Sequence, residues 1–74
     1  MSMLDQIITA SGLSPIFARG AITRALRRAG VTDDQLTRVA ARTALPEIRR
    51  AIEPFMQTKT DEVMRTIETV IESA

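Results

Sequence analysis

The chain contains no histidine, cysteine, tryptophan or tyrosine. Without histidine and cysteine, most nucleophile–base pairs and the usual ligands of transition metals are excluded. Without tryptophan and tyrosine, most of the aromatic platforms on which bases or sugars stack are lacking as well, and two phenylalanines are the only aromatic residues. The three glycines are isolated in the sequence and form no phosphate-binding loop. We therefore expect a protein that binds without catalysing a reaction, with no cofactor and no metal.

The sequence also lacks segments that direct a chain to or through a membrane. No apolar run approaches the roughly 18 residues that span a bilayer. The segment from Met1 to Asp5 has neither the basic start nor the apolar stretch of a signal peptide. A chain without cysteine is compatible with a reducing compartment. We expect a cytoplasmic protein with no membrane partner.

What the sequence does contain is a series of helix starts and stops. The 74 residues are 45% apolar, which is enough for the core of one small domain. Ser2 is suited to cap a first helix that ends at Gly12. Ser14 and Pro15 open a second helix that stops at Gly30, with an alanine-rich face opposite an arginine face. The alanine face would let a neighbouring helix approach closely.

Two further helices are expected in the middle of the chain. Thr32 and Gln35 fit a capping box, which predicts that a third helix begins at Thr32. Pro46 should break this helix and begin a fourth. Pro54 either ends that fourth helix, kinks it or stands at the start of a longer final helix; we favour an end near Glu53, followed by a connector over residues 54–58. The inner face of the third helix is expected to consist of Leu36, Val39, Ala40 and Ala44.

The last helix is expected to start at Thr58 or Thr60. Its apolar residues follow helical spacing along a single arc: Val63, Met64, Ile67, Val70, Ile71 and Ala74. This arc either closes the chain's own core or forms a short coiled-coil seam with a second copy. The sequence thus predicts an all-α fold, a compact single-domain bundle of four to five short helices over residues 1–74.

Charge is distributed unevenly along the chain. Between Leu13 and Arg50, eight arginines and three carboxylates give a net charge of +5, whereas residues 53–74 carry −3. Arginines at helical spacing either solvate outer faces, pairing with acids as in Arg49–Glu53, or bind an acidic partner or phosphates. The candidate partner-binding arginines are Arg19, Arg24, Arg27, Arg28, Arg38 and Arg42.

Residues 23–40 resemble a helix-turn-helix signature, with Gly30 in the turn and Leu36 facing inward from the second helix. The resemblance implies a DNA-binding role in which the second helix enters the major groove. Asp33 and Asp34 would stand in the first turn of that helix and repel the nucleic acid. Any contacts would therefore be mostly between arginines and phosphates, with little reading of base sequence.

Four apolar side chains fall outside the regular stripes: Ile16, Phe17, Phe55 and Met56. They either fill the core from irregular positions or stand exposed as anchors for a partner. Our leading hypothesis is a small, non-catalytic protein–protein interaction or regulatory module that binds through an apolar patch rimmed by arginines. Its partner would be a protein, and a second copy of the chain is one candidate. The alternative is a small nucleic-acid-binding protein that uses the arginine face.

Overall fold

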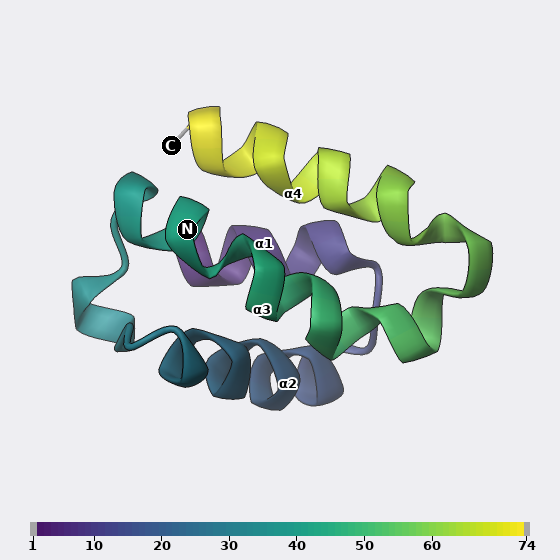
Figure 1. The fold of residues 1–74 in the computed structure, drawn as a ribbon, viewed down its shortest axis with the longest axis horizontal. Helices are drawn as coiled ribbons and strands as arrows, with labels where there is room; N and C mark the ends of the chain where they lie inside the picture. The colour runs from purple at the N-terminus through teal and green to yellow at the C-terminus, as the bar shows by residue number, and fades with distance from the viewer. Residues whose placement is uncertain (1, 74) are drawn as a thin grey trace.

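Helical elements follow one another along the whole of the described chain. The computed structural model describes residues 2–73, except for the side chain of Asp33, and this range contains no strand (Figure 1). The all-α class expected from the sequence is therefore confirmed. The elements in chain order are α1 (Met3–Ser11), α2 (Pro15–Arg28), the 3₁₀ turn η1 (Asp33–Gln35), α3 (Arg38–Met56), the 3₁₀ turn η2 (Gln57–Lys59) and α4 (Thr60–Ser73). Ala74, expected on the inner arc of the last helix, lies outside the described residues.

The ends of α1 and α2 follow the expected pattern of caps and glycines. The Ser2 hydroxyl accepts a hydrogen bond from the backbone N–H of Asp5 at 3.1 Å and so caps α1. Gly12 and Gly30 adopt φ angles of 71° and 81°, a left-handed conformation that residues with a Cβ atom disfavour. Ser14 makes no capping hydrogen bond with its side chain, contrary to expectation, and α2 begins with Pro15 at its first turn.

The expected helix start at Thr32 is wrong. Residues 33–35 form only the single turn η1, in which the Gln35 N–H donates to the Thr32 carbonyl at 3.0 Å. The long helix begins at Arg38, because the Thr37 hydroxyl offers the same chemistry and accepts from the Ala40 N–H at 3.2 Å. This later start leaves Val39 in the first turn, where its side chain is 68% exposed and does not join the inner face.

The expected break at Pro46 and the favoured helix end near Glu53 are also wrong, because α3 runs through both Pro46 and Pro54. Each proline removes one backbone N–H donor, but both are exposed, away from the helix face that packs on the core. That face is continuous across Pro46, with the side chains of Ala41, Ala44, Ile48 and Ile52 fully buried. Burial along this face offsets the lost hydrogen bonds. The connector expected over residues 54–58 shortens to η2, and the third and fourth expected helices are one helix.

The helices pack as an antiparallel bundle in which α1 and α3 each contact both α2 and α4 (Figure 1). The Cα trace measures 30 × 22 × 20 Å along its principal axes. Isoleucines form much of the core, and the alanine face of α2 packs inward as expected, with Ala18, Ala21 and Ala25 buried. Small side chains on that face let neighbouring helices approach closely.

The apolar arc of α4 belongs to this same core. Met64, Ile67 and Ile71 are buried, and Val63 is half-buried against them. This arc therefore fills the interior of the chain itself, which is one of the two outcomes that its spacing allowed. None of the helices within residues 2–73 combines the length and apolarity needed to cross a membrane.

Candidate partner-binding surface

Two aromatic side chains meet at one end of the bundle. The antiparallel course of α2 and α3 brings Phe17, in the first turn of α2, against Phe55, in the last turn of α3 (Figure 1). Their ring centroids lie 4.6 Å apart with an interplanar angle of 75°, an edge-to-face arrangement. Phe17 remains 38% exposed, Phe55 54% and the neighbouring Ile16 90%. We refer to Ile16, Phe17 and Phe55 as the aromatic end.

The fourth apolar candidate does not join this surface. Met56 is half-buried and packs against the hydrophobic core, so it helps to fill the core and does not stand exposed as an anchor. Ile16, by contrast, is the most exposed large apolar side chain in the described chain, which matches the second of the two roles that its place off the regular stripes allowed. Its position off the alanine face of α2 was the available signal, but sequence alone does not tell whether such a residue is covered by another helix.

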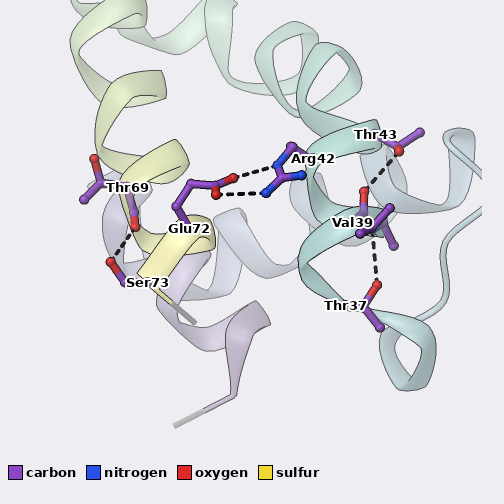
Figure 2. A network of polar contacts seen from close by, with 8 residues as sticks. Thr37, Val39, Arg42, Thr43, Thr69, Glu72 and Ser73 are labelled. Atoms are coloured by element: carbon purple, nitrogen blue, oxygen red, sulfur yellow. Dashed lines mark hydrogen bonds and ion pairs between the residues drawn. The ribbon is translucent and has the colours of Figure 1, made fainter.

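Three of the six candidate arginines interact within the molecule. Arg42 on α3 donates two hydrogen bonds to the Glu72 carboxylate on α4, at 2.6 and 2.8 Å (Figure 2). These bonds lower the pKa of Glu72, and the nearby charge of Arg38 adds to the effect. Arg19 on α2 pairs with Asp5 on α1 at 2.7 Å and lowers the pKa of that carboxyl. Arg19, Arg38 and Arg42 therefore have partners inside the bundle.

The other three candidates lie together on α2. Arg24, Arg27 and Arg28 are exposed, and none of them forms an ion pair with a described side chain. We refer to these three residues as the α2 basic face. The helix contains no acidic residue, and the like charges of Arg24 and Arg28, four residues apart, weakly destabilise it. Arg27 and Arg28 lie in the last turn, where the helix dipole favours positive charge, whereas Arg24 lacks that benefit.

The guanidinium of Arg24 connects the two parts of the surface. It lies over Gly20, with Nη1 3.4 Å from the position that a Cβ on Gly20 would occupy. Gly20 is one turn after Ile16 and Phe17 along α2. The Arg24 side chain therefore extends from the α2 basic face back toward the aromatic end, and apolar and cationic groups are brought close together on one helix.

The structure does not support the helix-turn-helix resemblance of residues 23–40. This segment holds the end of α2, the turn η1 and the first residues of α3, so nine residues separate the two helices. A helix-turn-helix joins its helices by three or four residues, at a steep angle. Here α2 and α3 instead pack side by side and antiparallel (Figure 1).

The described residues form neither a ligand pocket nor a metal site. The described part of the chain has no pocket, and its carboxylates do not gather in a group that could hold a metal ion. No family profile, no curated protein and no solved structure matches this chain. What remains is an exposed apolar cluster on the same side of the bundle as three arginines that form no ion pair with a described side chain.

Proposed function

We propose that this protein is a non-catalytic interaction module that binds another protein through the aromatic end and the α2 basic face. The observation that carries the proposal is the exposure of Ile16, Phe17 and Phe55 near arginines that form no ion pair with a described side chain. Aromatic residues and arginine are enriched at protein interfaces, and aromatic residues dominate their energetic centres. An apolar anchor would supply affinity, and the arginine rim would orient the partner and speed its approach.

In-cell photocrosslinking tests this proposal directly. Benzoylphenylalanine would replace Ile16, which is almost fully exposed, and in a matched control it would replace Thr69, which is exposed on α4. In the cells that make the protein, we expect irradiation to join the Ile16 variant, but not the Thr69 variant, to a discrete protein. Equal crosslinking at both positions, or none at Ile16, would contradict the proposal.

The alternative function, nucleic-acid binding, rests on the same three arginines. A surface that contacts three phosphates gives a slope of about −3 in a plot of log affinity against log salt, compared with about −5 for six contacts. Fluorescence anisotropy with generic duplex DNA at several salt concentrations measures this slope. Micromolar binding with the expected slope, lost in Arg27→Gln, would favour this alternative. The apolar aromatic end has no role in such phosphate contacts, which is why we prefer a protein partner.

A further inference from the structure

The described carboxylates on the helices that pack against α2 are already paired with other arginines. The two helices that pack against α2 are α1 and α3. The described carboxylates on α1 and α3 are Asp5, Glu47 and Glu53. Asp5 pairs with Arg19, Glu47 with Arg50 at 3.4 Å, and Glu53 with Arg49 at 3.8 Å. Each of these carboxylates is therefore already engaged with another arginine.

The acidic side chains of α4 cannot serve the α2 basic face either. α4 packs against α1 and α3 and lies diagonally across the bundle from α2 (Figure 1). Two of its acids, Asp61 and Glu72, are hydrogen-bonded to arginines of α3. No described carboxylate on α1, α3 or α4 therefore pairs with Arg24, Arg27 or Arg28, and Asp34 in η1 forms no ion pair with them either. These three cations are open to an acidic partner.

We infer that the partner is an acidic amphipathic helix that lies along α2. The carboxylates of this partner helix would contact the α2 basic face, and its apolar side chains would contact the aromatic end. This inference rests on the proposed function and specifies its partner. From Ile16 to Arg28 the surface extends for about 18 Å, at 1.5 Å per residue of helix. A partner helix of about three to four turns covers that length. Its acidic residues would lie in its N-terminal half, where the helix dipole favours them, so it would run antiparallel to α2.

A second copy of this chain is a poorer occupant of the same surface. It would bring three further arginines that have no ion-pair partner among the described side chains, and no carboxylate on α2. Its acidic helix α4 presents mainly polar residues outward, because its large apolar side chains are buried or half-buried in its own core. An acidic helix with exposed apolar side chains matches the surface in both charge and polarity, whereas α4 matches it in charge alone.

The test is a titration of the full chain with a designed peptide. The probe is a labelled 14-residue helical peptide, as long as α2, with glutamates in its N-terminal half and leucine and phenylalanine in its C-terminal half. A second peptide carries lysine in place of each glutamate. We expect the acidic peptide to bind with micromolar affinity in about 50 mM salt and the lysine peptide not to bind, because electrostatic complementarity selects between them.

Two matched variants locate the contact. Arg24→Gln removes a charge from the α2 basic face, and Arg65→Gln removes one from the exposed surface of α4. Loss of one charge-assisted contact should weaken the acidic peptide by about fivefold in Arg24→Gln, whereas Arg65→Gln should change its affinity by less than about twofold. Ile16→Ser should also weaken binding of the acidic peptide, because it removes an apolar contact at the aromatic end. Thermal unfolding followed by circular dichroism checks that all variants are folded.

The remaining outcomes overturn the inference in distinguishable ways. If crosslinking at Ile16 captures a protein but the acidic peptide binds no better than the lysine peptide, the partner is not acidic, and the proposed function stands. Duplex DNA or phosphatidylglycerol vesicles that bind more tightly than the peptide, and lose binding in Arg24→Gln, would assign the face to phosphates. A dimeric mass in light scattering that returns to the monomer in Ile16→Ser would make a second copy the occupant.

Discussion

At the scale of single residues, the buried hydroxyl of Thr60 lowers the stability of the folded chain. Thr60 is 5% exposed, and its Oγ1 has no hydrogen-bond partner among the described residues. Thr60→Val replaces this buried hydroxyl by a methyl group of similar shape. We expect the free energy of unfolding, measured in urea, to rise by about 1 kcal/mol. Thr66→Val is the control, because the exposed Thr66 hydroxyl already donates a hydrogen bond to the Glu62 carbonyl. The free energy of unfolding of this variant should change by less than about 0.5 kcal/mol.

Backbone conformation creates a second sensitive position at the turn between α3 and α4. Gln57 has φ 53° and ψ −114°, a region that a Cβ atom disfavours and that glycine adopts freely. Gln57→Gly should therefore raise the free energy of unfolding by about 1 kcal/mol. Gln57→Ala shortens the side chain but keeps the Cβ, so it should give no comparable gain. Equal stabilisation by both changes would show that the glutamine side chain, and not the backbone, is unfavourable.

At the scale of one helix, α2 contains a glycine with no conformational requirement for it. Gly20 lies inside the helix, and a Cβ there would meet the Arg24 guanidinium at 3.4 Å, an ordinary contact with a flexible side chain. Gly20→Ala should raise the free energy of unfolding by about 0.5–1 kcal/mol. Gly12→Ala should instead lower it by about 1 kcal/mol, because Gly12 has a φ of 71°. Two alanine substitutions of the same sign in urea denaturation would contradict this explanation.

The limits of sequence reasoning are also visible in individual helices. Spacing of apolar residues identifies the buried faces of α1, α2 and α4, since a helical period alone determines which side chains share a face. Thr32 and Thr37 offer the same capping chemistry, and choosing between them depends on packing that local sequence does not contain. For Pro46, the sequence signals a break, but the buried face that continues across it is a property of the assembled bundle.

At the scale of the whole molecule, pH should affect stability through ion pairs between helices. Asp5, Asp61 and Glu72 each pair with an arginine of a neighbouring helix, and hydrogen bonds from these arginines lower the pKa of each carboxyl. A carboxyl with a lowered pKa in the folded state binds a proton more readily when unfolded. Its stabilising effect is therefore complete above the pKa of the unfolded state, near 4, and is lost as pH falls through the lower folded value.

We accordingly expect stability to be constant from about pH 7 to 5 and to fall as the pH is lowered below about 4. Because all of these pairs are exposed, salt should reduce the dependence. Urea unfolding at several pH values measures it without adding ions. The variant Arg42→Gln removes the partner of Glu72 and should show a shallower fall. An identical pH profile in this variant would mean that the Arg42–Glu72 pair does not contribute.

The candidate surface itself depends on how the helices pack in the whole molecule. Sequence spacing marked Phe17, Phe55 and the arginines as candidates, but it did not show which of them would be exposed or paired. The contact between Phe17 and Phe55 requires α2 and α3 to run antiparallel. Which helices become neighbours decides that Arg19 and Arg42 form ion pairs and that Arg24 has no ion-pair partner among the described side chains. Crossing geometry of this kind is set by packing between helices far apart in the sequence.

The antiparallel course of the helices also gives the bundle two structurally different ends. The start of α1 and the end of α4 lie together at one end of the 30 Å long axis, and the aromatic end lies at the other (Figure 1). A tether attached at Ser2 or Ser73 would therefore leave the aromatic end pointing away from the point of attachment. Immobilisation on a sensor surface, or fusion to a carrier protein at either site, would keep the aromatic end accessible for binding.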